Sequence, residues 1–349
     1  MNQEIPNQSR IDKSALTLGM SLLICGLTFL FINYSVKHFL LLIIGFGLGV
    51  SLYHAAFGFT GSWRNFILER NGNGVRSQLL AIGLAILLIL PLLGSESLFG
   101  NNIVGALGPI GVSVIIGSFL FGLGMQLGGG CGSGTLFTIG GGNSRMLITL
   151  IFFILGSLLG TLHLPWRLSL PSLGTISLST YMNTMQTIIT QWIVLGFIAW
   201  VTIYFEKQHH QNISKIYTKL DKSIIHVFLQ GRWPLLWGAV ALALLNMFTL
   251  FVAGHPWSVT FAFGLWGAKV ATLLGVDVAQ WEYWTWAYPS RALHQSILND
   301  SVSLTNIGLI LGAFIASSLS GKGSSIIKIS LRSSLAAILG GILMGYGAR

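Results

Sequence analysis

The chain has 349 residues, of which 53% are hydrophobic and only 8% are charged. In soluble domains about a quarter of all residues are charged, so the low charged fraction excludes a soluble globular protein. The high hydrophobic fraction excludes a disordered one. The net charge of +10 comes without a basic stripe among exposed aromatic residues, so it favours positive loops held on the cytoplasmic side of a membrane over a nucleic-acid partner.

The apolar runs predict about nine transmembrane helices, each close to the 20 residues that a bilayer requires. An N-terminal tail (1–14) precedes the first run, which is too long for a signal peptide and lacks a small-x-small cleavage site. The predicted spans are 15–34, 38–57, 78–94, 109–127, 146–164, 185–205, 234–253, 304–320 and 333 to the end. The sequence therefore predicts an all-α polytopic integral membrane protein.

Three stretches between these spans are not clean membrane helices. Residues 58–70 and 128–143 are too polar, too short or too rich in glycine. The third stretch, 255–298, holds charged residues among apolar patches, namely Lys269, Asp277 and Glu282, and Asp300 follows it. Broken segments are tolerated at membrane depth only where protein or water surrounds them, and in transporters they point to the binding site.

The longest polar stretch, 206–232, divides the chain into a first transmembrane repeat (15–205) and a second one (233–349). The positive-inside rule predicts that this basic loop lies in the cytoplasm. Its charged residues are Glu206, Lys207, Lys215, Lys219, Asp221, Lys222 and Arg232. The spacing of three glycines in the first half recurs in the second at an offset of 223 residues, Gly117, Gly122 and Gly124 matching Gly340, Gly345 and Gly347.

The sharpest feature is a glycine-rich loop around Cys131, with Gly128, Gly129 and Gly130 before the cysteine and Gly132 after it. So many glycines disfavour a continuous helix and permit a tight loop with inward-facing N–H groups. A half-helix that begins near Thr135 or Asn143 would attract anions to its N-terminus. The soft, polarisable thiol suits a sulfur-containing ligand.

The run GLGMQLGGGCGSGT (122–135) resembles the YeeE/YedE family of bacterial inner-membrane sulfur-compound transporters, whose characterised members import thiosulfate. GFTGSWRNFI (58–67) and LRSSLAAILGGILMGYGAR (331–349) extend the resemblance along the chain. The resemblance implies two inverted repeats with short re-entrant half-helices that meet near the midplane. It also implies that cysteines pass the anion along by S–H···S contacts without covalent chemistry.

Two departures from the family pattern concern its other cysteines. Thiosulfate-importing members tend to carry a cysteine just before the Thr-Gly-aromatic-Arg element, where Gly58 stands here. The second Gly-Cys loop, placed by the repeat offset, would fall at position 354, so we expect a second repeat that is truncated. Cys131 is then the one residue that matches a family cysteine.

Several residues keep two interpretations. Cys131 could be a small packing residue, but its place in an interrupted loop favours a substrate pathway. Lys269, within an apolar run, is either functional or a snorkelling side chain. Arg145 either draws anions inward or caps a membrane end. We expect Cys25, which lies among Leu and Ile residues, to be a packing residue. We expect Asp300 to cap the N-terminus of the helix predicted over 304–320.

The remaining polar and aromatic residues indicate no chemistry of their own. His54, His255 and His294 have no metal-ligand spacing, and no persuasive Ser/His/Asp or paired-carboxylate arrangement is present. We therefore predict that the protein is not an enzyme and that it binds neither a metal ion nor a cofactor. The aromatic run 281–286 (WEYWTW) predicts an interfacial belt rather than a ligand cage.

The sequence thus predicts a multi-pass protein of the bacterial inner membrane that transports a small sulfur-containing anion such as thiosulfate. The predicted pathway residues are Gly58, Gly128, Gly129, Gly130, Cys131, Gly132, Thr135 and Lys269. Two alternatives stay open: a membrane subunit that delivers sulfur to a cytoplasmic sulfurtransferase, and an inactive truncated family member. The first of these needs a reactive thiolate at Cys131.

Overall fold

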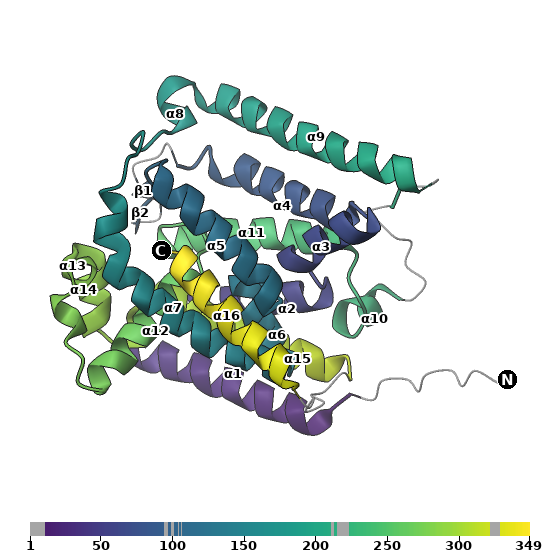
Figure 1. The fold of residues 1–349 in the computed structure, drawn as a ribbon. Coiled ribbons are helices and arrows are strands. Elements are labelled where there is room, and N and C mark those ends of the chain that lie inside the picture. Colours follow the sequence, from purple (N-terminus) through teal and green to yellow (C-terminus); the bar gives the residue numbers. More distant parts are fainter. Residues whose placement is uncertain are drawn as a thin grey trace.

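The computed structural model describes residues 11–93, 97–98, 101–103, 105, 107–210, 213–214, 223–321 and 329–349. The long helices lie side by side in a bundle (Figure 1). They are α1 (Lys13–Asn33), α2 (Val36–His54), α4 (Asn73–Ile89), α5 (Val112–Gly128), α7 (Ser144–Leu168), α9 (Thr184–His209), α11 (Leu235–Ala253), α15 (Ser301–Leu319) and α16 (Leu331–Gly347).

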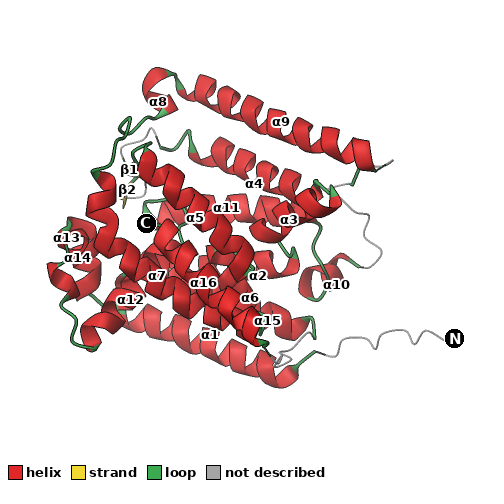
Figure 2. Cartoon of the chain, in the orientation of Figure 1, coloured by secondary structure: helices red, strands yellow, loops and turns green. Residues whose placement is uncertain are grey.

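Each of the predicted spans coincides with one of these helices to within a few residues. Seven helical stretches within the described ranges are long and apolar enough to cross a membrane, while α4 and α16 are shorter apolar helices. Apart from the two-residue strands β1 (Ser97–Leu98) and β2 (Asn101–Asn102), the regular structure of the described residues is helical (Figure 2). The prediction of an all-α polytopic membrane protein is confirmed.

Short helices occupy the three stretches predicted to be broken. The first two contain α3 (Phe59–Glu69) and α6 (Gly132–Gly140). The third contains α12 (Thr260–Leu273), η1 (Val278–Gln280), α13 (Glu282–Thr285), α14 (Ala287–His294) and η2 (Ile297–Asn299). Two further short helices are α8 (Leu178–Tyr181) and α10 (Ile224–Leu229). Of the predicted basic loop 206–232, Lys215, Lys219, Asp221 and Lys222 lie outside the described residues.

Glycines bring two pairs of helices into backbone contact. A side chain at Gly117 of α5 would meet the Gly347 carbonyl of α16, and one at Gly124 would meet the Gly340 carbonyl. The residue numbers of these contacting pairs increase along α5 while they decrease along α16, so the two helices pack antiparallel. Helix α2 packs in the same close manner on α15, where a side chain at Gly308 would meet the backbone of α2. Small residues permit this approach where lipid gives no hydrophobic drive for helices to associate.

The helix ends divide between two faces of the bundle. Helix α2 ends beside the segment 223–233, since the His54 ring contacts the Gly231 carbonyl at 3.0 Å and stacks on Trp233. Helix α9 ends on the same face, where Glu206 pairs with Arg76 at the start of α4. The start of α2 therefore lies at the opposite face.

Two expectations about side chains are wrong. Trp284 and Tyr283 are buried, and the Trp284 indole donates a hydrogen bond to Thr161 Oγ1 at 3.2 Å, so these two side chains belong to a packed cluster and not to an interfacial belt, whereas Trp286 is exposed. Cys25 is exposed on α1, so it is not packed among other helices. An apolar run alone does not distinguish a side chain that faces lipid from one that faces protein.

Candidate functional site around Cys131

The Gly-Cys loop is a break between two helices. Helix α5 ends at Gly128, and Gly129 follows with φ of 85°, a left-handed conformation that ends the helix. Cys131 is the N-cap of α6, and its Sγ accepts a hydrogen bond from the Gly134 N–H at 3.4 Å. The Thr135 hydroxyl donates to the Cys131 carbonyl at 2.8 Å. The loop therefore holds the thiol at the start of a half-helix.

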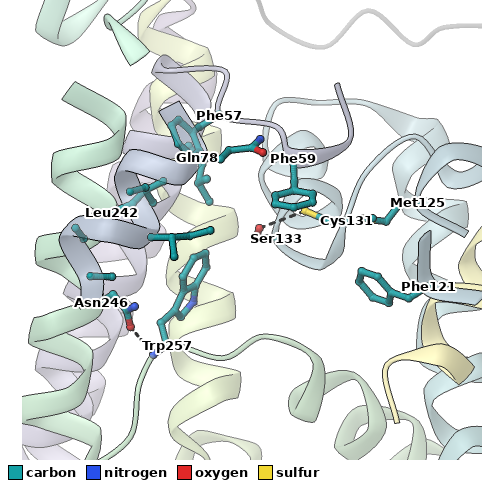
Figure 3. Close-up of a pocket in the computed structure, with 15 residues that line it drawn as sticks. Phe57, Phe59, Gln78, Phe121, Met125, Cys131, Ser133, Leu242, Asn246 and Trp257 are labelled. Atoms are coloured by element: carbon teal, nitrogen blue, oxygen red, sulfur yellow. Dashed lines mark hydrogen bonds between the residues drawn. The ribbon is translucent and has the colours of Figure 1, made fainter. Parts of the chain in front are cut away.

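Cys131 lines a cavity of about 490 Å³ whose other lining residues come from six helices and the segments beside them. Figure 3 shows the thiol beside the ring of Phe59, with Ser133 Oγ at 3.6 Å from Cys131 Sγ. The other lining residues are Leu52, Phe57, Gln78, Ala81, Ile82, Ala85, Phe121, Met125, Leu242, Ala243, Asn246 and Trp257. The walls are thus mostly apolar and aromatic, with a few polar groups, as is usual for a small-molecule site.

Three polar side chains besides Ser133 define the chemistry of this cavity. Gln78 donates to the Gly58 carbonyl at 3.2 Å, and within the described part of the chain its Oε1 has no partner. Asn246 Oδ1 accepts from the Trp257 backbone N–H at 2.8 Å and so fixes that residue. The Trp257 indole N–H is buried and has no partner among the described residues. A buried donor of this kind can bind the oxygen of a ligand.

The predicted glycines give the loop its shape rather than contacts in the cavity. Side chains at Gly128 and Gly129 would collide with Met344 and with Arg145 respectively. Gly130 packs over the backbone of Thr135, and Gly132 faces Val259. Thr135 itself is fully buried. Of these residues, Cys131 alone is among those that line the cavity.

Gly58 does not itself line the cavity, but it stands between two residues that do. It is the N-cap of α3, and its carbonyl accepts the hydrogen bond from Gln78. Its neighbours Phe57 and Phe59 both line the cavity. The structure thus brings the two neighbours of Gly58 to the same cavity as Cys131, although Gly58 and Cys131 are more than 70 positions apart in the sequence.

Lys269 and Arg145 are not among the residues that line the cavity. Lys269 Nζ donates to the carbonyls of Leu293 and Gln295 at 2.8 and 2.6 Å, so it ties α12 to the end of α14. Arg145 donates to the Leu127 carbonyl at 2.7 Å and thereby caps the last turn of α5. Asp300 is the N-cap of α15, as predicted, and accepts from the Ser303 N–H at 2.8 Å.

Sequence reasoning missed Gln78, Asn246 and Trp257 as cavity residues. A signal existed for the two amides, because polar side chains inside apolar spans are costly unless they have a role or a partner. Trp257 carried no such signal, since only the fold brings it to the cavity. Within the described ranges, no group of three or more His, Cys, Asp or Glu side chains could hold a metal ion.

Comparison with known proteins gives one family match. The model of the family described as Sulphur transport matches residues 54–349. The thiosulfate transporter TsuA of Escherichia coli (strain K12) is 24% identical over 317 residues, which cover 88% of this chain and 82% of that protein. TsuA of Spirochaeta thermophila is 31% identical over 117 residues, covering 33% of this chain and 34% of that protein. The probable transporter YedE of Escherichia coli is 27% identical over 124 residues, covering 36% and 30%.

Proposed function

Because the chain belongs to the Sulphur transport family, we propose that it carries a small sulfur-containing anion such as thiosulfate across the bacterial inner membrane. The observation that carries this proposal is the Cys131 thiol, which lies at a helix break and lines a cavity of about 490 Å³. The names of the two TsuA relatives support thiosulfate as the substrate. The long apolar helices support a location within a membrane.

The residues of the cavity can bind a small anion without holding it too firmly. The Cys131 S–H can approach the soft terminal sulfur of thiosulfate, while the N-terminus of α6 favours negative charge. The Trp257 indole N–H and the Ser133 hydroxyl can donate to its oxygens. The other walls are apolar, so few bonds must break on release, as transport requires.

Two inverted repeats are part of the proposal. The offset of 223 residues pairs Gly117 with Gly340 and Gly124 with Gly347. If a two-fold axis relates the two halves of the chain, a contact between Gly117 and Gly347 must be accompanied by an equivalent contact between Gly340 and Gly124. Both close approaches occur, between antiparallel helices. This agreement supports a pseudo-two-fold axis between α5 and α16, with the Cys131 break directly after α5.

The test is uptake of ³⁵S-thiosulfate by cells that lack their own thiosulfate transporters. Wild-type protein should raise uptake well above the empty vector, and Cys131→Ala should lower it at least tenfold. Cys25→Ala is the matched control, because that thiol is exposed on α1 outside the cavity, and it should transport like wild type. If Cys131→Ala and wild type take up thiosulfate equally, the thiol has no role in transport. If wild type shows no uptake above the empty vector, thiosulfate is not the substrate.

Sulfur delivery to a cytoplasmic sulfurtransferase predicts a different chemical state of Cys131. In that function the Cys131 thiolate would attack the outer sulfur of thiosulfate, so that the S–S bond of thiosulfate breaks, sulfite leaves and a persulfide remains on Cys131. Mass spectrometry of protein purified from thiosulfate-fed cells detects this persulfide as an added sulfur. Non-covalent transport predicts an unmodified thiol. A persulfide at Cys131 together with absent net uptake would favour delivery over transport.

A further inference from the structure

The start of α3 brings an aromatic ring to the Cys131 thiol. Phe59 is the first residue of α3, and its ring lies beside the thiol in the cavity (Figure 3). The ring is 39% exposed, so packing around it does not fix its position. Its contact with Trp63, at 6.2 Å between the ring centroids, is made within the same helix. The place of the ring therefore depends on where the backbone of α3 begins.

The backbone is left-handed on both sides of α3. Ala56, in the turn before the helix, has φ of 46°, and Arg70, directly after it, has φ of 53°. In the described part of the chain these are the two residues other than glycine with a positive φ. Such conformations are costly for residues with a Cβ atom and persist only where surrounding contacts hold them. The position of α3 is thus imposed by its contacts with the rest of the protein.

Gln78 of α4 supplies such a contact at the start of α3. Its Nε2 donates to the carbonyl of Gly58, the N-cap of α3, at 3.2 Å. Gln78 is buried, so this bond is shielded from water. Two polar atoms of α3 itself, Thr60 Oγ1 and Trp63 Nε1, are buried without a partner among the described residues. Gln78 therefore supplies the polar contact that joins this end of α3 to α4.

The far end of α3 and the helix that carries Gln78 are held independently. The His210 ring contacts the Glu69 carbonyl, in the last turn of α3, at 2.8 Å. Helix α4 is anchored by the ion pair between Arg76 and Glu206, one turn or less from Gln78. Loss of the Gln78 amide should therefore free the start of α3 and leave its far end and α4 in place.

We propose that Gln78 is a positioning residue of the transport site, because its bond to Gly58 holds the Phe59 ring beside the Cys131 thiol. The ring shields the sulfur from water and narrows the approach to it. This inference rests on the proposed function and adds to it a residue that controls access to the thiol without binding the ligand.

The test measures how fast iodoacetamide alkylates Cys131 in purified protein, in a Cys25→Ala background that leaves one thiol to be read by mass spectrometry. Gln78→Leu should raise the rate about tenfold, because the released ring no longer shields the sulfur. Phe59→Ala should raise it as much. Gln126→Leu makes the same substitution at an exposed residue of α5 that does not line the cavity, and it should leave the rate unchanged.

The double variant Gln78→Leu/Phe59→Ala distinguishes positioning from a general loosening of the protein. If Gln78 acts through Phe59, the double variant is alkylated no faster than Phe59→Ala alone. The proposal is overturned if the two effects multiply, or if Gln78→Leu is alkylated at the rate of wild type.

Gln78→Glu tests the hydrogen bond itself with little change of shape. A protonated carboxyl can donate to the Gly58 carbonyl, whereas a carboxylate cannot. Relative to wild type at the same pH, alkylation should be unchanged at about pH 5 and about tenfold faster at about pH 9. The added charge alone would act in the opposite direction, because it disfavours the thiolate. A ratio that stays constant with pH would contradict the role of the bond.

Alkylation does not require transport, so the two proposals fail separately. If wild type takes up no thiosulfate while Gln78→Leu accelerates alkylation through Phe59, the proposed function fails and the positioning role stands. If wild type transports and the alkylation rates of wild type, Gln78→Leu and Gln126→Leu are equal, the positioning role fails and the proposed function stands.

Discussion

Gly122 and Gly124 are two residues apart on α5 but face different surroundings. A side chain at Gly124 would meet the backbone of Gly340 and Met344, whereas one at Gly122 would meet nothing within 4 Å. Gly124→Ala should therefore lower the free energy of unfolding by about 1–3 kcal/mol through overpacking. Gly122→Ala should raise it by up to about 1 kcal/mol, because alanine favours helix over glycine.

Thermal unfolding of both glycine variants in the same detergent checks this contrast. The expected order of unfolding temperatures is Gly122→Ala at or above wild type, then Gly124→Ala below it. Equal temperatures for the two variants would mean that α5 and α16 do not approach as closely as the structure shows.

At the level of single residues, the sequence predicted the position of Cys131 more successfully than its surroundings. Glycines that cannot sustain a helix require a break, and the break exposes the residue at its centre. Gln78, Asn246 and Trp257 come from α4, α11 and the segment before α12. Their convergence depends on how separate helices pack, which the local pattern of one chain does not contain.

Helix α9 is attached to the bundle by a buried ion pair at its end. Much of α9 is exposed, but Glu206 is fully buried, and its Oε2 lies 2.5 Å from Arg76 Nη1. The backbone of Ser214 completes the network, donating to Glu206 and accepting from Arg76. The sequence alone assigned Glu206 to the basic cytoplasmic loop 206–232, because the partner of its carboxylate, Arg76, lies 130 positions away.

Arg76→Gln should lower the free energy of unfolding by about 3–5 kcal/mol, because it leaves the Glu206 carboxylate buried without its partner. Lys207→Gln, at the exposed neighbour of Glu206, should change it by no more than about 0.5 kcal/mol. Arg76→Met/Glu206→Leu should recover most of the loss, since no unpaired charge remains. Unfolding temperatures in detergent measure all three, and an Arg76→Gln variant as stable as Lys207→Gln would show that the pair does not hold α9.

The number and limits of the long helices followed from the sequence because each needs an apolar run of membrane length. The internal order of residues 255–298 did not follow, since its short helices are stabilised by contacts between them. Trp284, for example, is buried against α7 through its hydrogen bond to Thr161. Aromatic residues in a short polar stretch fit an interfacial belt equally well until the fold is known.

For the whole molecule, the helix directions predict which ends face the cytoplasm. In a variant whose own cysteines are replaced (Cys25→Ala/Cys131→Ala), Lys37→Cys should react in intact cells with a membrane-impermeant maleimide, because the start of α2 lies opposite to the basic loop. Lys13→Cys, at the other end of α1, should react only with a permeant maleimide or after lysis. Labelling of Lys13→Cys but not Lys37→Cys by the impermeant reagent would invert the topology.

The glycine contacts between α2 and α15 and between α5 and α16 have a consequence for the kinetics of turnover. Where two helix backbones are in direct contact, no flexible side chains lie between them to adjust when one helix shifts along the other. We therefore expect the movements of turnover to be confined to side chains of the cavity wall, such as Trp257 and Phe59, whose rotations are local. We expect the initial uptake rate in liposomes to vary little between short-chain and long-chain phosphatidylcholine. A strong dependence on bilayer thickness would instead indicate a rocking movement of whole helices.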